Sequence, residues 1–219
     1  MRPLRAAVLA LAVAHLALAP AARAAEVLLQ AVSFPEGARV DVPFAGSGRA
    51  PAGATLEAGV RLDGTRTRIA LSWKRMKPAI LFGGDVTSYV LWAVAPDGAA
   101  ENLGEVFTRE AKGSAEYSTS RRSFGLLVTA EPHPGVGSPS EVVVFTGEAP
   151  KPEKARSEPF PFARLSGEAT PATPSIATAE WAGGEPLELL QARAVLARAE
   201  RPKSGDPDQS VPREARAAL

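Results

Sequence analysis

Residues 86–94 of this 219-residue chain have the sequence Val-Thr-Ser-Tyr-Val-Leu-Trp-Ala-Val. β-Branched and aromatic residues dominate this stretch, and its apolar run is nearly continuous, which is typical of a strand covered on both faces. Pro96-Asp97-Gly98 follows, with the residues that a tight turn requires. We therefore expect a hairpin in which Leu103–Phe107 returns beside the first strand.

A second pattern, in residues 65–73, alternates strictly. Thr67, Ile69, Leu71 and Trp73 fall on one side of a pleat together with Thr65, and Arg66, Arg68, Ala70 and Ser72 fall on the other. Such alternation predicts a strand with one buried and one solvated face.

Further segments in the first two thirds of the chain carry strand patterns between short turn signals. The expected strands span residues 26–33, 39–44, 55–62, 123–131 and 141–146. Seven or eight short strands without a helix predict an all-β domain over residues 25–147. An immunoglobulin-like two-sheet sandwich is the favoured fold, because each sheet must cover its apolar face with another layer. A small barrel is the alternative.

The N-terminus has the organisation of a secretory signal peptide. Arg2 and Arg5 precede an apolar run over residues 6–19, and Ala22-Arg23-Ala24 offers a small-residue cleavage site. The run is shorter than the roughly 20 apolar residues of a membrane span. We expect cleavage after Ala24 and export to the periplasm or the outer envelope, with no transmembrane span afterwards; an uncleaved N-terminal anchor is the alternative.

Composition excludes several function classes. The chain has no Cys, which rules out disulfide scaffolds, thiolate zinc sites, cysteine nucleophiles and a bacterial lipoprotein anchor. Removing the three arginines of residues 1–24 leaves 22 basic against 24 acidic residues, a net charge of about −2. With that balance the chain has no excess of basic residues, such as nucleic-acid binding requires.

Beyond residue 147 the composition changes. Residues 148–184 are rich in Pro, which predicts a disordered, flexible linker. Phe160 and Phe162 in this linker could dock on a partner, but isolated aromatic residues in linkers more commonly have no such role. Residues 185–201 predict a short helix, because Pro186 suits a helix start and Leu187, Leu190, Ala194 and Ala197 recur on one side. Residues 202–219 are expected to be a disordered tail.

The candidate chemical groups do not converge in the sequence. His133 is the single His after residue 24, and we interpret it as part of an exposed loop. Gly83-Gly84-Asp85 lacks a phosphate-loop frame and indicates a turn. Asp97, Glu101 and Glu105 do not have calcium-loop spacing. Lys74, Arg75 and Lys77 form a basic cluster, either at a solvated strand end or against an acidic partner.

The aromatic residues offer one more possibility, a platform for sugar. Trp73, Trp92, Tyr89 and Phe124 could form it, but alternation favours core positions, and Trp181 has no assigned role. We therefore predict no catalytic residue, no metal and no cofactor, and leave the binding residues open.

Several segments resemble a known group of exported proteins. The matching segments are residues 87–94, 96–98, 102–105, 124–132 and 139–144, with residues 186–193 resembling the start of a helical region. Over roughly residues 54–147 the chain resembles the N-terminal β-domain of OmpA-like envelope proteins of the acidobacterial type. In that group the domain precedes long helices and a peptidoglycan-binding domain. The sequence contains neither, so no binding residue is carried over.

These observations lead to two functional hypotheses. The favoured one is an exported, non-catalytic β module that makes structural or protein–protein contacts with envelope proteins, through a sheet edge or the helix. The alternative is a carbohydrate or cell-wall-binding module that uses exposed aromatics. An envelope hydrolase is disfavoured, because the sequence offers no cluster of ionisable groups.

Overall fold

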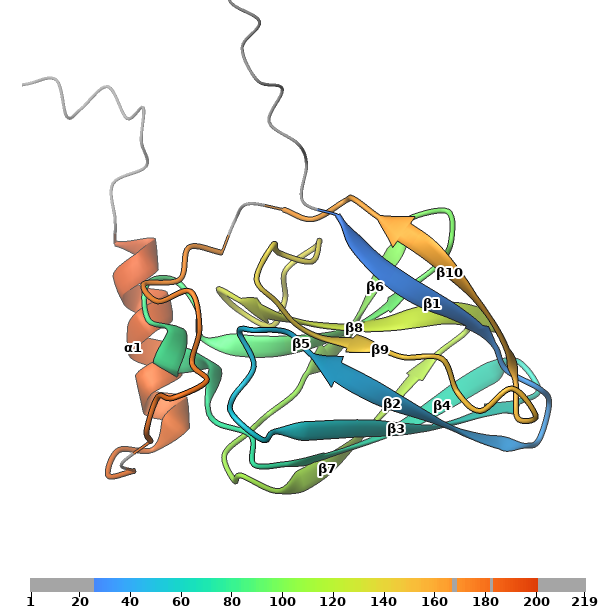
Figure 1. Ribbon diagram of the computed structural model, residues 1–219. Coiled ribbons are helices and arrows are strands. Elements are labelled where there is room, and N and C mark those ends of the chain that lie inside the picture. Colours follow the sequence, from blue (N-terminus) through green and yellow to red (C-terminus); the bar gives the residue numbers. More distant parts are fainter. Residues whose placement is uncertain (1–25, 167–168, 182, 201–219) are drawn as a thin grey trace, which may run out of the picture.

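A computed structural model describes residues 26–166, 169–181 and 183–200 (Figure 1). The predicted signal peptide, residues 1–24, and the predicted tail, residues 202–219, lie outside the described residues. The first strands are β1 (Val27–Ser33), β2 (Arg39–Gly46), β3 (Thr55–Asp63), β4 (Arg66–Lys74) and β5 (Ser88–Val94). They are followed by β6 (Ala100–Glu105), β7 (Gly113–Thr119), β8 (Ser123–Glu131), β9 (Val143–Gly147) and β10 (Arg156–Phe162). A 3₁₀ turn, η1, spans Ala79–Phe82, and the helix α1 spans Leu187–Ala199.

The strands confirm the all-β prediction but not the immunoglobulin-like two-sheet sandwich. Antiparallel pairing runs in the order β6-β5-β8-β9-β2-β3-β4-β7, which bends into one nearly closed, barrel-like sheet. Its two end strands, β6 and β7, meet through side chains: the Tyr117 hydroxyl donates to the Glu105 carbonyl (2.8 Å), and the Thr119 hydroxyl donates to Glu101 Oε2 (2.7 Å). The sheet thus covers its own apolar face by closing, as a barrel does.

A two-stranded layer, β1 with β10, lies outside this sheet (Figure 1). β1 joins the sheet where Val32 and Ser33 pair with the start of β8. Two apolar clusters result. The larger one fills the sheet interior, and the smaller one lies between the β1–β10 layer and the outer faces of β5 and β8. The second cluster contains Leu29, Trp92 and Leu127.

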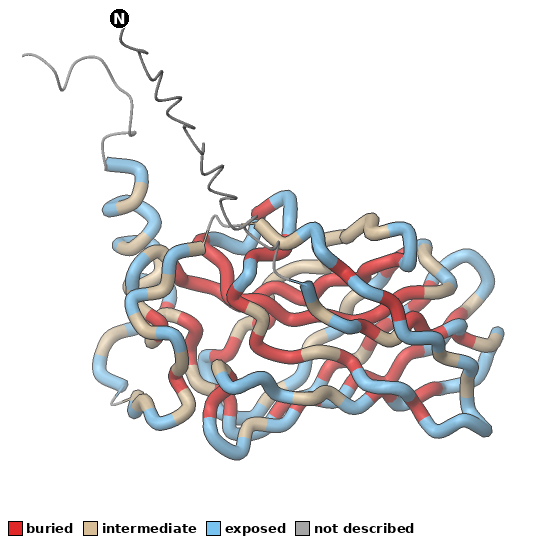
Figure 2. The backbone as a smooth tube through the Cα atoms, turned by 45° about the horizontal axis from the view of Figure 1, so that its top comes forward, coloured by how far each residue is buried: buried red, intermediate tan, exposed pale blue. Residues whose placement is uncertain are grey.

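The two clusters explain the two kinds of strand pattern. All seven residues of β5 are buried, because the strand has the interior cluster on one face and the β1–β10 layer on the other. In β4 the residues Thr67, Ile69, Leu71 and Trp73 are buried and its arginines are exposed, while Thr65 is exposed in the preceding turn. In Figure 2 buried residues are concentrated in the strands, and α1 is mainly exposed or intermediate.

Residues 148–184 differ from the predicted flexible linker. Residues 156–162 form β10, which pairs with β1 along its whole length. Pro159 and Pro161 lack N–H donors, but β10 has only β1 as a partner, and edge strands tolerate proline. Phe160 and Phe162 alternate with these prolines and point into the second cluster, so they dock within the chain rather than on a partner.

Residues 169–181, which we call the strap, pack against one end of the sheet. Ile176 is completely buried in the interior cluster. The strap is held by backbone hydrogen bonds, from Asp85 N to Thr170 O (3.0 Å) and from Thr173 N to Phe82 O (2.9 Å). The strap and η1 lie at the end of the sheet next to α1 (Figure 1). α1 itself agrees closely with the predicted helix.

Candidate functional site

The predicted site residues lie apart from one another. His133 is exposed in the loop after β8, as expected. Gly83 and Gly84 have φ values of 63° and 64°, which confirms the turn. From the basic cluster, Lys77 donates to the Ala179 carbonyl and so holds the strap within the chain.

The three carboxylates of the β5–β6 hairpin each have a different partner. Asp97 Oδ1 accepts from the backbone of its own turn at Ala99 (2.9 Å). Glu101 accepts from Arg121 Nε at 3.1 Å, and Glu105 accepts from the Gln191 amide at 2.9 Å. They therefore do not share a centre. No group of three or more His, Asp or Glu side chains within residues 26–166, 169–181 and 183–200 is placed to hold a metal ion.

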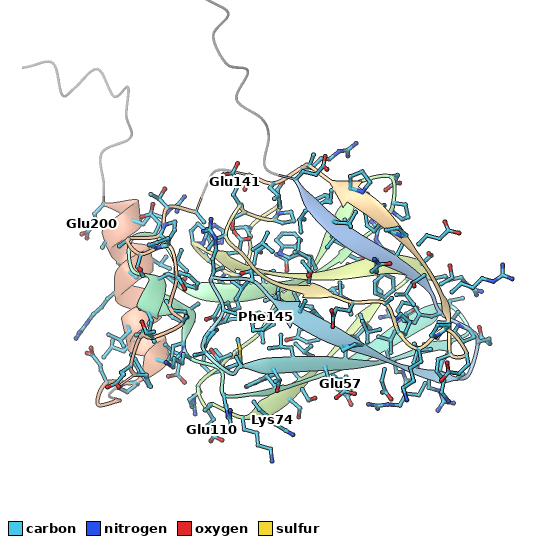
Figure 3. All side chains as sticks on the ribbon, viewed as in Figure 1. Glu57, Lys74, Glu110, Glu141, Phe145 and Glu200 are labelled. Atoms are coloured by element: carbon cyan, nitrogen blue, oxygen red, sulfur yellow. The ribbon has the colours of Figure 1, made fainter. Side chains whose placement is uncertain are left out.

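The four aromatic residues considered as a sugar platform are core residues. Trp73, Tyr89, Trp92 and Phe124 are all buried. Burial raises the pKa of the Tyr89 phenol well above its usual value. Trp181 is half-buried and lines an open hollow of about 340 Å³ with Arg109, Glu185 and Leu187. Phe145 lies among the interior side chains, whereas Glu57 on β3 is exposed (Figure 3).

A buried polar network at the end of β8 was not predicted from the sequence. Trp92 Nε1 donates to the Thr129 hydroxyl (2.8 Å), which in turn donates to Glu131 Oε1. The Ser140 amide also donates to Glu131 Oε1, at 2.7 Å. Glu131 is completely buried in this network. Glu131 Oε1 accepts hydrogen bonds from Thr129 on β8 and from Ser140 in the loop after β8. The network therefore connects this loop to Trp92 in the second cluster and has a structural role.

Arginines gather on the outer face of the sheet. Arg39 on β2 is the direct cross-strand partner of Arg61 on β3, which is in turn the partner of Arg68 on β4. We call these three residues the arginine row. More than half of each side chain is exposed. The row was missed in the sequence because its members are distant along the chain and meet only through strand register.

An open groove of about 570 Å³ contains the arginine row. Its lining carries four arginines, the row and Arg66, against the two carboxylates of Asp63 and Glu116. Arg39 Nε donates to Asp41 Oδ1 and Arg61 Nε to Asp63 Oδ1, both at 2.8 Å. Arg68 Nε lies 4.0 Å from the other oxygen of the same Asp63. With Asp41 counted, three carboxylates stand against four guanidinium groups, so the groove has one guanidinium group more than nearby carboxylates.

The inner side of α1 docks on the domain mainly through polar contacts. Gln191 Nε2 donates to the Thr87 carbonyl at 3.1 Å and to Glu105 Oε1 at 2.9 Å. Arg198 lies 3.8 Å from Asp85, and Glu188 pairs with Arg109. The one buried apolar residue of the helix is Leu187. Leu190 and Ala194 are half-buried on the same side as predicted, whereas Ala197 is exposed.

The outer side of α1 is mainly apolar. At 3.6 residues per turn, six residues fall on one arc opposite the docked side, and one of them is Glu188, whose carboxylate pairs with Arg109. The other five are apolar: Leu189, Ala192, Val195, Leu196 and Ala199, which we call the outer face of α1. The three large ones are 40–60% exposed. Large exposed apolar side chains grouped on one surface commonly mark an interaction site.

Within the described part of the chain, no helix is both long and apolar enough to cross a bilayer. Comparisons with protein-family models, with curated proteins and with solved structures found no match to this chain.

Proposed function

We propose that this chain is an exported, non-catalytic β module that makes protein–protein contacts in the bacterial cell envelope, and that the outer face of α1 is its contact surface. The observation that carries the proposal is the grouping of Leu189, Val195 and Leu196 on the solvent side of a docked helix. The resemblance to OmpA-like envelope proteins supports the setting.

The chemistry of the outer face favours another helix as the partner. Ala192 and Ala199 stand between the larger residues, and small residues let two helix backbones approach closely while the larger ones fill grooves. Burying an apolar side chain fully contributes about 1.5–3 kcal/mol. Three side chains that are already partly covered therefore contribute a few kcal/mol in total. That energy suits a modest, reversible contact.

The experiment compares two lysine substitutions in the full chain. Leu196→Lys places a charge on the outer face of α1, and Leu28→Lys places one on β1 at a leucine that is equally exposed, at 64% against 60%. Both variants are expected to fold as the unaltered chain does. In pull-downs from envelope extract, the same protein should be retained by the unaltered chain and by Leu28→Lys but lost with Leu196→Lys.

Two results would reject the proposal. One is retention that Leu196→Lys leaves unchanged. The other is capture of purified cell-wall sacculi with no captured envelope protein.

The alternative, a carbohydrate-binding module, has one supporting observation. Trp181 is the most exposed of the three tryptophans and borders an open hollow. Glycan fragments added to the chain should leave its tryptophan fluorescence unchanged if the protein-contact proposal is correct. Quenching that disappears in Trp181→Phe would favour the alternative instead.

A further inference from the structure

We propose that α1 is a hinged arm which the β-domain holds through weak polar contacts and releases, and that release regulates the protein contact by adding the inner side of the helix to its outer face. This inference rests on the proposed function. In Figure 1, α1 lies outside the strands, at one end of the sheet. Residues 183 and 184 separate the helix from the strap.

The apolar contact between α1 and the domain is small. Leu187 is the one buried residue of the helix, and most of the others are exposed. The strap differs, because its Ile176 is completely buried in the interior cluster and its backbone is hydrogen-bonded to Phe82 and Asp85. A helix of this length obtains most of its stability from packing. The strap is therefore a fixed part of the domain, whereas α1 is held weakly.

The remaining contacts of α1 are polar. Besides the two hydrogen bonds of Gln191, they are the pair of Arg198 with Asp85 and the pair of Glu188 with Arg109. The side chains of Glu188 and Arg109 are 48% and 64% exposed. Ion pairs that are exposed contribute about 0–1 kcal/mol, and salt screens them. These contacts orient the helix on the domain without fixing it there.

The surface beneath α1 is suited to contact with water. The start of the helix is packed against seven residues of the domain, and five of them carry hydroxyl or carboxylate groups: Thr87, Ser88, Tyr89, Glu105 and Thr108. Buried hydroxyl groups gain hydrogen bonds to water when they are uncovered. Release of α1 therefore exposes little apolar surface of the domain.

Gly183 and Gly184 have the properties of a hinge. Their φ values are 69° and 112°, which side-chain-bearing residues rarely adopt. A Cβ atom added to either residue would meet no atom within 4 Å, so packing does not restrict this part of the chain. Hinges are short segments that absorb large changes in backbone dihedral angles, which glycine permits at low steric cost. The helix can therefore leave the domain while the strap stays in place.

Release changes the surface that α1 offers to a partner. In the docked helix, Leu187, Leu190 and Ala194 lie on the inner side, and the outer face alone is accessible. Nine of the thirteen residues of α1 are apolar, on the outer and the inner side alike. A helix that is apolar on most sides is normally enclosed by other structure. A partner that encloses both sides binds the released helix and shifts the equilibrium towards it.

The experiment measures backbone hydrogen exchange of the full chain by mass spectrometry, without a partner. Exchange in residues 187–199 should become several-fold faster between about 0.01 M and about 1 M salt, because the Debye length falls from about 30 Å to about 3 Å. Exchange in the strap should not change. Gln191→Ala should accelerate exchange in α1 about fivefold or more, since it removes two hydrogen bonds to the domain. Alanine favours helix more than glutamine does, so this acceleration reports release and not a weaker helix.

Two further substitutions have matched controls. Arg109→Gln should accelerate exchange in α1 about threefold, whereas Arg39→Gln removes an arginine of similar exposure, 62% against 64%, from an ion pair outside α1 and should have no effect there. Gly183→Ala should accelerate exchange through the backbone alone, because alanine disfavours the docked conformation. Gly37→Ala, with a φ of 73° and equally open surroundings, carries the same penalty away from the hinge and should leave α1 unchanged.

Three results would overturn the release of α1. They are exchange in α1 that responds neither to salt nor to Gln191→Ala, exchange of the strap together with α1, and equal effects of Arg109→Gln and Arg39→Gln. In pull-downs, Gln191→Ala should retain more of the captured envelope protein than the unaltered chain does. Retention that is no greater would overturn the regulatory role.

Leu196→Lys separates this inference from the proposed function. Leu196 is on the outer face, so the substitution should leave exchange in α1 unchanged while the captured envelope protein is lost. Because exchange is measured without a partner, failure of the release is distinguished from failure of the protein-contact proposal.

Discussion

Phe162→Ala tests whether β10 belongs to the folded domain. Phe162 is 1% exposed and packs in the second apolar cluster with Leu29 and Trp92. Replacing a buried Phe by Ala costs about 3–5 kcal/mol. The lower end of that range applies here, because β10 has one strand partner and can relax into the space created. We expect a loss of about 3 kcal/mol in the free energy of unfolding.

Urea unfolding, followed by tryptophan fluorescence, measures the change, with Leu28→Ala as the matched control. Leu28 lies on the same β1–β10 pair, opposite Pro161, but is 64% exposed. Its truncation should cost about 0.5 kcal/mol or less. In a thermal scan, Phe162→Ala should lower Tm by roughly 6 °C or more. If Phe162→Ala costs no more than Leu28→Ala, residues 156–162 do not form part of the core and the description of β10 fails.

Two other predictions concern the interior and the strap. The chain has two tyrosines, and burial raises the pKa of both Tyr89 and Tyr117, with the charge of Glu105 adding to the effect at Tyr117. The contribution of the two buried tyrosines to stability is complete below the unfolded pKa of about 10 and is lost as the pH rises above that value. Absorbance at 295 nm should therefore show less phenolate at about pH 11 in the native chain than in urea. Equal titration of the native and the unfolded chain would contradict this. Gly84→Ala should destabilise the chain and increase proteolysis in the strap, because Gly84 has a φ of 64° and an added Cβ would overlap a backbone oxygen of the strap. Gly64→Ala is the matched control, because Gly64 has a similar φ of 63° and open space where the Cβ would be added. It should lower the free energy of unfolding only by the backbone penalty of about 1–2 kcal/mol. Equal losses in the two variants would rule out the overlap at Gly84.

The sequence predicted the strands that carry strong apolar patterns. β5, β4 and β8 lie where their alternating or continuous apolar residues indicated. β7 was missed because Gly113–Thr119 contains mostly small and polar residues of low strand preference. It is held in place by pairing with β4 over seven residues. β10 was missed because its prolines favour a linker, and only its position at an edge makes them compatible with a strand.

Closure of the sheet could not be predicted from local patterns. Alternation specifies which residues face inward, and a sandwich and a barrel satisfy it equally well. The contacts that bring β6 and β7 together involve single side chains such as Thr119 and Tyr117. The arginine row could not be predicted from local patterns for the same reason. The alternation of β4 indicated that Arg68 faces solvent, but its position beside Arg61 depends on register, which the sequence does not specify.

The pairing of β1 with β10 joins the first strand of the domain to the last. A nascent chain can pair strands β2 to β9 earlier, but Trp92 and the rest of the second cluster stay uncovered until residue 162 has emerged. Contacts between residues so far apart in sequence form slowly, because a long loop must close first. Covering of the second cluster therefore requires both ends of the β-domain to join, and a polypeptide that stopped at residue 147 would expose the apolar outer surface of β5.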